Sequence, residues 1–360
     1  MASVFDIVND LENIAPPQLA DPEDKIGLQA GDMATQVKHV CVVVDVTDRV
    51  IETAIERRSD MIVAHHPLIF KPLTSVAQTN PVQRRLIALI KANIALFVMH
   101  TNYDAARGGI NDVLAEALGV VGSEILTTQA TDPFVKVVVF VPAEAVEEVR
   151  NAMSDAGAGV IGQYTHCSFR SAGTGSFVPM SAAHPYIGSA GKLEEVDEYR
   201  LEMICTASET NDVVDAAVEA HPYDEVAYDI YELANEPVSY GYGRIGSLDE
   251  EMTLSAFADR VKAALGLEYI KVAGNVDQKI RRVAVCGGSG SGQYKEAAAA
   301  GADVYVTGDT KHHDILDAND LGLSIIDAGH FHTEKPGMVA LANRLKRMYE
   351  NHGIEVDYVE

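Results

Sequence analysis

The chain has 360 residues, 47% of them hydrophobic, so it can bury a large core and is long enough for two domains. Its formal net charge of -25 opposes binding to phosphate backbones and to anionic lipid surfaces, and its only basic cluster is the short segment 344–347. The composition therefore argues against nucleic acids and membranes as partners.

The cysteines and the first residues of the chain indicate a reducing compartment. The four cysteines lie far apart without CxxC spacing, which is typical of buried free thiols: Cys41, Cys167, Cys205 and Cys286. The first residues show no basic segment followed by an apolar one, and no apolar run approaches the roughly 18 residues that span a bilayer. We therefore expect a cytoplasmic protein.

Short apolar runs alternate with helical patterns from residue 37 onward, which is typical of βα units and mostly parallel sheets. In chain order, the sequence predicts strand 37–46, helix 47–60, strand 61–65, helix 81–93, strand 95–101 and helix 109–118. The same alternation returns later with strand 282–286, helix 293–300, strand 303–307, helix 311–318, strand 323–327, helix 335–350 and strand 354–359. Both ends of the chain therefore share one α/β style.

The middle of the chain departs from this rhythm. It predicts strand 134–142, an Ala/Glu-rich helix, a Gly-rich stretch at 173–179, strand 199–207, helix 210–220 and strand 225–233. Two strand–helix–strand groups of this size are typical of a small α+β sandwich of roughly 100 residues. We therefore predict a discontinuous metal-binding α/β domain, residues 1–130 plus 236–360 with mixed, mostly parallel sheets, interrupted by an α+β domain at 131–235.

Two histidines stand where one predicted strand ends. In parallel α/β sheets, the loops at the carboxyl ends of the strands converge on one crevice, and His65 and His66 lie at such an end. Adjacent side chains on an extended chain point to opposite sides, so each histidine could serve a different metal ion. The alternative is a strand-end pair that faces water.

Two further clusters also follow predicted strands. Asp104, after the strand at 95–101, can supply an oxygen ligand or can cap the helix that follows. His330 and Glu334 are spaced i, i+4, so in a helical turn both project from one face, where the carboxylate can bridge two cations. On its own, such a pair is also common on solvated helix faces.

Together these clusters supply three imidazoles and two carboxylates: His65, His66, Asp104, His330 and Glu334. This set matches the ligands of hydrolytic two-metal sites, in which two ions lie about 3.5–4 Å apart. We therefore expect two divalent ions per subunit, of zinc, manganese or iron. The expected chemistry is attack by a metal-bound hydroxide on a small phosphate-bearing or heterocyclic substrate.

A fourth cluster offers candidate catalytic residues. Asp309 and His313 are again spaced i, i+4 after a predicted strand, and they could orient metal ligands or transfer protons. The alternative is a helix cap with its first turn. The glycine run at 287–292 also lies between a strand and a helix, where its N–H groups could bind phosphate or simply form a tight turn.

At these residues the sequence resembles the Nif-three-like family, the dinuclear metal centre proteins often named GTP cyclohydrolase 1 type 2 homologs. The resemblance is carried by Asp24–Gly31, Ala64–Lys71, His100–Ala105, Gly108–Asp112, Thr307–Asp309 with His313, and Gly329–Glu334. These segments span both outer parts of the chain. The combination of HHP, TNxD and GHxxxE in this order is specific to that family.

The resemblance implies that His65, His66, Asp104, His330 and Glu334 are the metal ligands, with Glu334 shared between the ions. It also implies a ring-shaped homohexamer whose sites face an internal cavity. The middle of the chain resembles the inserted domain of longer bacterial members, similar in shape to nitrogen-regulatory and copper-tolerance trimers. That likeness is carried by Gly173–Phe177, His184–Tyr186 and His221–Glu225.

Two functions follow from these features. The first is a metal-dependent hydrolase similar to GTP cyclohydrolase 1 type 2, which opens the ring of a purine nucleotide at C8 or acts on a related small substrate, with Asp309 or His313 moving protons. The second is a non-catalytic hexamer that handles or senses metal, in which the insert binds a small ligand. Likeness of fold does not decide between them.

Overall fold

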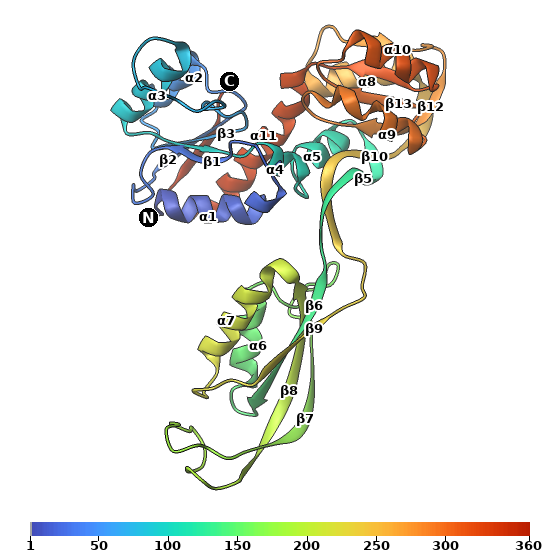
Figure 1. Cartoon of the computed structure of the whole chain (residues 1–360). Helices are drawn as coiled ribbons and strands as arrows, with labels where there is room; N and C mark the ends of the chain where they lie inside the picture. The colour runs from blue at the N-terminus through green and yellow to red at the C-terminus, as the bar shows by residue number, and fades with distance from the viewer. Residues whose placement is uncertain (1) are drawn as a thin grey trace. The chain divides into compact units, whose positions relative to one another are not determined.

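The computed structural model describes residues 2–360, which form two compact units (Figure 1). The first unit comprises Met1–Ala130 and Tyr240–Glu360, and the second comprises Thr131–Ser239. The predicted fold class, mixed α/β with an α+β insert, is confirmed. No helix of residues 2–360 is long and apolar enough to cross a membrane.

The first unit contains a five-stranded sheet in the order β1-β4-β3-β2-β15. Its strands are β1 (Gly27–Ala30), β2 (His39–Val43), β3 (Met61–Ala64), β4 (Ala95–Val98) and β15 (Glu355–Tyr358). Four of them are parallel, and only β1 at the edge is antiparallel. The residues of β2, β3 and β4 are buried throughout, as expected for parallel strands covered on both faces.

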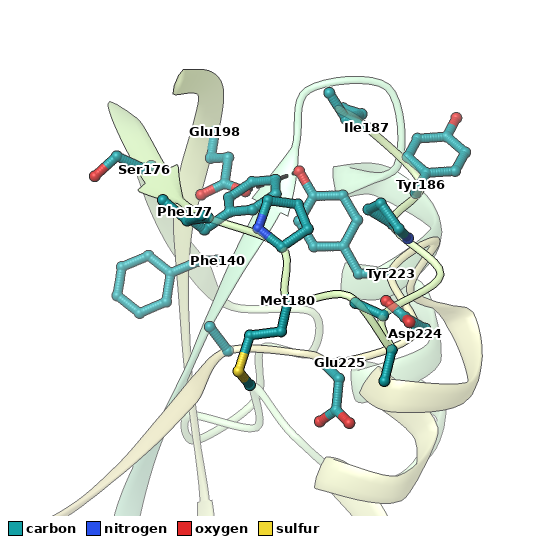
Figure 2. Close-up of a pocket in the computed structure, with 17 residues that line it drawn as sticks. Phe140, Ser176, Phe177, Met180, Tyr186, Ile187, Glu198, Tyr223, Asp224 and Glu225 are labelled. Carbon is teal, nitrogen blue, oxygen red and sulfur yellow. Dashed lines mark hydrogen bonds between the residues drawn. The ribbon is translucent and has the colours of Figure 1, made fainter. Parts of the chain in front are cut away.

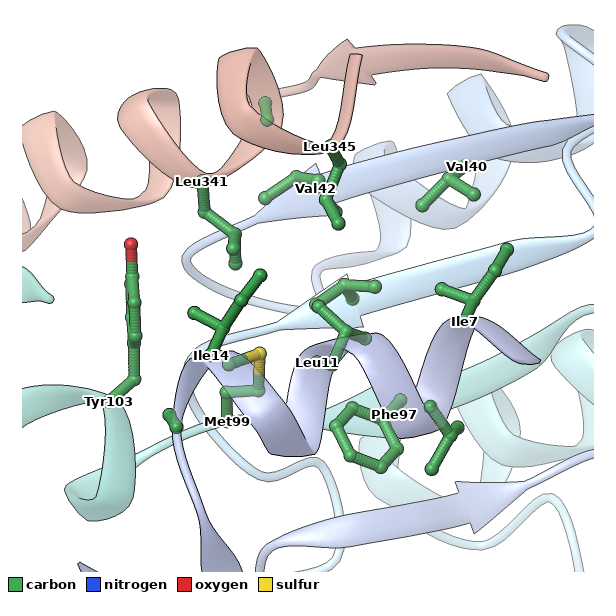
Figure 3. Close-up of a cluster of buried hydrophobic side chains, with 14 of the residues drawn as sticks. Ile7, Leu11, Ile14, Val40, Val42, Phe97, Met99, Tyr103, Leu341 and Leu345 are labelled. Atoms are coloured by element: carbon green, nitrogen blue, oxygen red, sulfur yellow. The ribbon is translucent and has the colours of Figure 1, made fainter. Parts of the chain in front are cut away.

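Helices cover both faces of this sheet. They are α1 (Val4–Ile14), α2 (Asp48–Glu56), α3 (Pro81–Ala92), the short α4 (Thr101–Ala105) and α11 (His330–Tyr349), with a 3-10 turn at Pro17–Leu19. On one face, Leu11 of α1 and Leu341 of α11 pack against Val42 (Figure 3). On the other face, α2 and α3 bury Ile51 and Leu89. The sheet is thus held rigidly between two apolar layers.

A six-stranded sheet in the order β11-β14-β13-β12-β10-β5 forms the rest of the first unit. Its strands are β5 (Val120–Asp132), β10 (Val238–Thr253), β11 (Lys271–Ala273), β12 (Lys279–Val285), β13 (Val304–Thr307) and β14 (Ser324–Asp327). The strands β12, β13 and β14 are parallel, whereas β10 is antiparallel to β12 and β11 is antiparallel to β14. The accompanying helices are α5 (Ile110–Ala117), α8 (Leu254–Leu265), α9 (Tyr294–Ala299) and α10 (His312–Asp320), with a 3-10 turn at Gly290–Gln293.

The second unit has the split βαβ arrangement of ferredoxin-like domains. Its elements are β6 (Phe134–Pro142), α6 (Val146–Asp155), β7 (Ser168–Phe177), β8 (Glu194–Thr206), a 3-10 turn at Ala207–Glu209, α7 (Thr210–Ala220) and β9 (Tyr228–Glu232). The sheet is antiparallel, in the order β7-β8-β6-β9, and both helices pack on one of its faces (Figure 1).

Several strands were not predicted, and the start of one helix was wrong. The Gly-rich stretch at 173–179 lies mostly in β7, because glycines 173 and 175 adopt extended backbone opposite β8. The long strands β5 and β10 were not predicted, since polar residues and glycines interrupt their apolar pattern. Helix α11 begins at His330 rather than near residue 335, so Pro336 lies inside it. The earlier start places His330 and Glu334 one turn apart on the same helix.

Candidate metal centre

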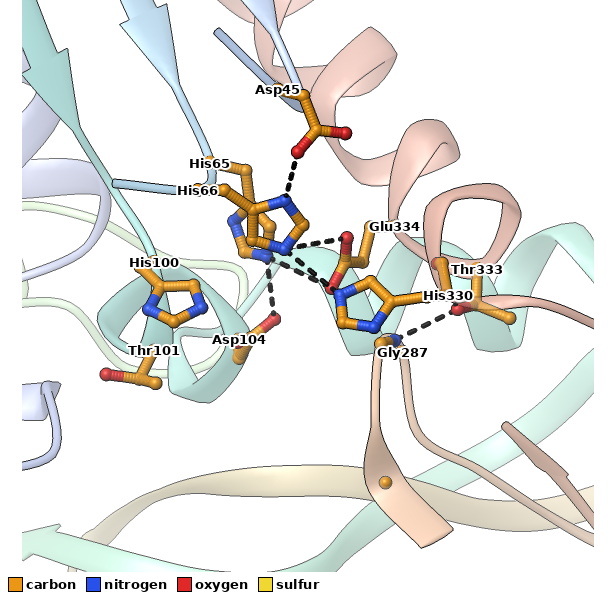
Figure 4. Close-up of polar contacts among 12 residues, drawn as sticks. Asp45, His65, His66, His100, Thr101, Asp104, Gly287, His330, Thr333 and Glu334 are labelled. Carbon is orange, nitrogen blue, oxygen red and sulfur yellow. Dashed lines mark hydrogen bonds and ion pairs between the residues drawn. The ribbon is translucent and has the colours of Figure 1, made fainter. Parts of the chain in front are cut away.

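The candidate ligands come from strand ends of both sheets in the first unit. His65 and His66 directly follow β3, and Asp104 lies in α4, which follows β4. His330 and Glu334 occupy the first two turns of α11, just after β14 of the other sheet. Figure 4 shows these side chains pointing toward one another. The cluster is therefore a meeting of two sheets, each contributing from the carboxyl ends of parallel strands.

Glu334 lies at the centre of this cluster. Its Oε1 is 2.9 Å from Nε2 of His330 and 3.5 Å from Nε2 of His65, while its Oε2 is 3.3 Å from Nε2 of His66. Asp104 approaches from the other side, with Oδ1 3.6 Å from Nε2 of His65. The side chains of His65 and Glu334 are only 0% and 4% exposed, so this carboxylate is almost completely removed from bulk water.

The two adjacent histidines do not diverge as the strand geometry predicts. The rings of His65 and His66 lie with centroids 5.0 Å apart, and both Nε2 atoms approach the same carboxylate. The regular strand ends at Ala64, and the chain bends through the next two residues, so the alternation of side chains no longer applies. Both imidazoles can therefore take part in one cluster.

The Nδ1 atom of each imidazole is held by a separate acceptor. Nδ1 of His65 lies 2.9 Å from the carbonyl oxygen of Met99, and Nδ1 of His66 lies 2.9 Å from Oδ1 of Asp45. Nδ1 of His330 lies 2.7 Å from Oδ2 of Asp309. Carbonyl and carboxylate oxygens only accept, so each Nδ1 carries the proton that it donates. In the neutral imidazole this leaves the Nε2 lone pair free, which is the tautomer that a metal requires.

A fourth histidine shows the same arrangement. Nδ1 of His100 donates to Asp24 at 2.8 Å, and its ring centroid lies 5.2 Å from that of His65. Two groups of side chains could hold a metal ion, namely His65, His66 and His100, and His66, His330 and Glu334, with the ligand atoms of each group within 4.8 Å of one another. His66 belongs to both groups, as expected for two neighbouring ion positions.

Three polar atoms of the cluster are buried without a hydrogen-bond partner within residues 2–360. They are Nε2 of His65, Oδ1 of Asp104 and Oε2 of Glu334. A buried polar atom without a partner costs roughly 1–3 kcal/mol, so folded proteins rarely leave three of them side by side. All three are atom types that coordinate divalent cations, and a cation among them would satisfy them together. The donor set therefore fits a metal site.

The charges of the cluster shift several pKa values. Burial lowers the pKa of His66, but the neighbouring carboxylates of Asp45 and Glu334 outweigh it and raise this pKa to about 10. The hydrogen bond to Glu334 likewise raises the pKa of His330 to about 9. Burial raises the pKa of Asp104 to about 6, whereas the imidazoles hold that of Glu334 far below its ordinary value despite burial. The cluster thus attracts positive charge strongly.

Glycines allow two loops to approach the cluster closely. A Cβ atom on Gly288 would lie 2.3 Å from Oε1 of Glu334, and one on Gly308 would lie 2.5 Å from the backbone nitrogen of His330. Two N–H groups of the glycine run form hydrogen bonds within the protein. Gly287 donates to Asn111, and Gly288 donates to Thr333. The N–H groups of Gly287 and Gly288 are therefore not free to bind phosphate, and close packing accounts for Gly288 and Gly308.

All five candidate ligands thus lie together in the structure. Of the two candidate catalytic residues, only Asp309 contacts the cluster. Asp309 contacts His330 directly, with its own side chain 59% exposed. His313, at the start of α10, stacks edge-on against His312 and has no hydrogen bond or ion pair with the cluster within residues 2–360. Asp104 does not cap the helix predicted at 109–118, since Gly109 is the N-cap of α5, and it lies inside α4, whose N-cap is His100.

Sequence reasoning missed three residues that support the cluster: Asp24, Asp45 and His100. Asp45 is the second residue after β2, again at the carboxyl end of a parallel strand, and this position is a signal that could have identified it. Asp24 begins one of the segments that carry the family resemblance, but nothing within that segment marks it as the partner of a metal ligand. Only its contact with His100, far along the chain, reveals its role.

Known proteins resemble this chain along almost its whole length. The family model described as Duf34/NIF3 (NGG1p interacting factor 3) matches residues 2–360. The chain belongs to the Duf34/NIF3 family. It is 45% identical over 325 residues to a Bacillus subtilis protein named GTP cyclohydrolase 1 type 2 homolog, covering 90% of this chain and 87% of that one. A Halalkalibacterium halodurans protein of the same name is 40% identical and covers 98% and 95% of the two chains.

Two solved structures agree with the fold. A Bacillus cereus protein related to NIF3 superposes with a TM-score of 0.88 at 44% identity, covering 99% of this chain and 95% of that one. A Staphylococcus aureus protein superposes with a TM-score of 0.70 at 31% identity over 99% and 95% of the two chains. Both cover the insert as well as the outer parts, so the interrupted architecture of this NIF3 protein recurs in its relatives.

Proposed function

We propose that this NIF3 protein is a metal-dependent hydrolase with a dinuclear centre. Its ligands are the five clustered side chains, His65, His66, Asp104, His330 and Glu334, with Glu334 shared between two divalent ions. The observation that carries the proposal is the convergence of three Nε2 atoms on one buried carboxylate. Within residues 2–360, three of the ligand atoms gathered there have no hydrogen-bond partner. Zinc, manganese and iron all suit such a set of imidazoles and carboxylates.

Bound divalent ions would lower the pKa of a water molecule and polarise an oxygen of the substrate. The protein's own part is to hold the ligand atoms in place. Met99, Asp45 and Asp309 each accept the Nδ1 proton of one histidine and so fix the direction of its Nε2 atom. Burial of His65 and Glu334 keeps bulk water from competing for the ligand atoms.

Asp309 is the residue best placed to hold a proton beside the cluster. Its carboxylate joins Nδ1 of His330 to the solvent-exposed side of the site, so it can accept a proton from that nitrogen or return one. The role of His313 in proton transfer stays a prediction, because its ring contacts His312 and no contact links it to the cluster within residues 2–360.

The substrate class that we propose is a purine nucleotide, opened by hydrolysis as in a GTP cyclohydrolase reaction. Support comes from the name that the relatives carry, GTP cyclohydrolase 1 type 2 homolog. A ring-shaped homohexamer in the cytoplasm is the assembly that we propose for it. Light scattering after size-exclusion chromatography tests that assembly directly.

The decisive experiment measures formate release from GTP by metal-free protein to which zinc, manganese or iron is added back. Turnover is expected only with metal, and Glu334→Ala should abolish both metal retention and turnover. Glu350→Ala, at the exposed end of the same helix, is the matched control and should keep both. Elemental analysis of each purified variant separates loss of metal from loss of chemistry.

Metal-loaded protein that binds GTP but hydrolyses neither it nor simple phosphoesters would overturn the hydrolase proposal. The same cluster would then serve a regulatory or metal-handling hexamer. Dissociation of that hexamer by a chelator, without turnover of any nucleotide, is the result that would favour this alternative.

A further inference from the structure

Three sequence motifs that the metal centre does not use meet in the second unit. They are Gly173–Phe177 at the end of β7, His184–Tyr186 in the connection between β7 and β8, and His221–Glu225 after α7. Members of all three line one cavity of about 760 Å³ (Figure 2). This volume lies within the range of about 300–1,000 Å³ that is usual for small-molecule sites.

Aromatic side chains form much of the wall of this cavity. Phe140, Phe177, Tyr186 and Tyr223 all line it. The ring of Tyr223 lies 6.2 Å from that of Phe177 and 6.1 Å from that of Tyr186, measured between centroids. Aromatic faces carry negative charge density and attract organic cations.

A carboxylate is held in the same wall. Oε1 of Glu198 accepts a hydrogen bond from the hydroxyl of Tyr223 at 3.0 Å (Figure 2). A Cβ atom at position 175 would lie 2.1 Å from Oε2 of Glu198, so only glycine leaves room for the carboxylate at this position. Gly175 of the first motif therefore leaves space for Glu198, and Tyr223 of the third motif orients its carboxylate.

The connecting loop is fixed over the cavity by a second acid. The backbone N–H of His184 donates to Oδ2 of Asp224 at 3.1 Å, which joins the loop carrying Tyr186 to the segment after α7. Glu225 adds another carboxylate to the lining, while no lysine, arginine or histidine belongs to it among the described residues. The cavity is thus apolar and aromatic, with negative charge and no positive group to balance it.

We propose that this cavity binds a small organic cation. Its ammonium group would pair with Glu198 and face Tyr223, and its apolar part would lie against Phe140 and Phe177. A neutral apolar ligand would leave the carboxylate without a counter-charge, and an anion would be repelled by it. The proposal concerns a different unit from the metal centre and does not depend on the hydrolase function.

The test uses the full-length protein and two matched pairs of probes. Benzyltrimethylammonium and choline are the cations, and neopentylbenzene and 3,3-dimethylbutan-1-ol are the neutral molecules of the same shapes. Calorimetry and saturation-transfer NMR should show binding of the cations, with the neutral partners weaker by about tenfold or more. Binding should persist after chelation of all metal, because the metal centre takes no part in it.

Variants locate the binding site. Glu198→Gln should weaken cation binding by about tenfold or more, whereas Glu219→Gln, an exposed acid on α7, should leave it unchanged. Tyr223→Phe keeps the aromatic face but removes the hydroxyl that orients Glu198, so an intermediate loss is expected. Thermal unfolding of each variant shows that the domain is still folded.

Several outcomes would overturn the proposal. One is a folded protein that binds none of the cations at about 10 mM. Another is equal binding of the neutral molecules, or an unchanged affinity in Glu198→Gln. If no probe binds and Tyr223→Ala weakens self-association of the protein, the cavity belongs to a segment of a second copy of the chain instead.

Discussion

Nδ1 of His330 lies 2.7 Å from Oδ2 of Asp309, and this contact directs the opposite ring nitrogen of His330 at the central carboxylate of the cluster. Asp309 has a backbone φ of 53°, a left-handed conformation that aspartate and asparagine tolerate better than most residues. An asparagine at this position therefore keeps the backbone and the size of the side chain while removing its charge.

We expect Asp309→Asn to weaken metal binding by about 10- to 100-fold, the usual effect of removing a carboxylate that orients a ligating histidine. Competition with a fluorescent chelator measures this affinity. Asp320→Asn, an exposed acid at the end of α10, is the control and should bind metal like the wild type. Equal affinities in the two variants would show that Asp309 does not orient His330.

Metal binding should strengthen as the pH rises. The folded protein raises the pKa of His66 to about 10 and that of His330 to about 9, above the unfolded value near 6.5. Stability that these protonated imidazoles give the metal-free protein is complete below pH 6.5 and is lost as the pH rises through 9 to 10. A metal ion requires the unprotonated Nε2 atoms, so it competes with these protons.

The increase in Tm on adding manganese should therefore grow between pH 6.5 and pH 9. Scanning calorimetry of the metal-free and metal-loaded protein checks this growth, and calorimetric titration in buffers of different ionisation enthalpy counts the protons released. An increase in Tm that stays constant or shrinks over this range would mean that the imidazoles do not exchange protons for metal.

A buried arginine joins β10 to α5 and to the end of α4 near the site. Arg244 in β10 is 1% exposed and donates to Asp112 in α5 and to the carbonyl oxygens of Gly241, Gly243 and Ala106. Arg244→Met leaves Asp112 and these carbonyl groups without their donor. Because Asp112 remains partly exposed, we expect a loss of about 3 kcal/mol in the free energy of unfolding, at the lower end for broken buried ion pairs.

Urea unfolding followed by circular dichroism measures the effect of Arg244→Met, since the chain has no tryptophan. Arg281→Met, on the exposed side of β12, is the control and should change the free energy of unfolding by no more than about 0.5 kcal/mol. If the two variants were equally stable, the buried ion pair would make no net contribution.

The βα rhythm predicted the parallel strands well, because fully buried strands such as β3 and β13 read as continuous apolar runs. It could not show which strands share a sheet. The first strand of the rhythm, β2, pairs with β15 at the other end of the chain, and no local pattern records that pairing. The distribution of strands between two sheets therefore emerged only from the structure.

The long strands β5 and β10 were missed for a different reason. A Cβ atom on Gly241 would lie 2.0 Å from the carbonyl oxygen of Thr127, so this glycine permits close approach of two backbones rather than a turn. Sequence alone does not distinguish these two uses of glycine. The ligand clusters were easier to predict, because histidines and acids after apolar strands point to one edge of a sheet whatever the order of its strands.

Gly288 gives the sharpest test of close packing at the site. Its φ is +66°, and an added Cβ atom would lie 2.3 Å from Oε1 of Glu334. Gly288→Ala should therefore push the central carboxylate away from His330 and lower metal affinity by about tenfold or more, in addition to costing about 1–2 kcal/mol for the left-handed backbone. Chelator competition and thermal unfolding measure the two effects separately.

Two glycines of the same chain serve as controls for Gly288→Ala. Gly301 has a φ of +76° with open space around its Cβ position. Gly301→Ala should therefore lose the same stability from its left-handed backbone as Gly288→Ala, but it should bind metal like the wild type. Gly292 has open space without a left-handed φ, so Gly292→Ala should change neither property. If Gly301→Ala lost as much metal affinity as Gly288→Ala, the effect would come from general destabilisation, and contact between Gly288 and Glu334 would not be its cause.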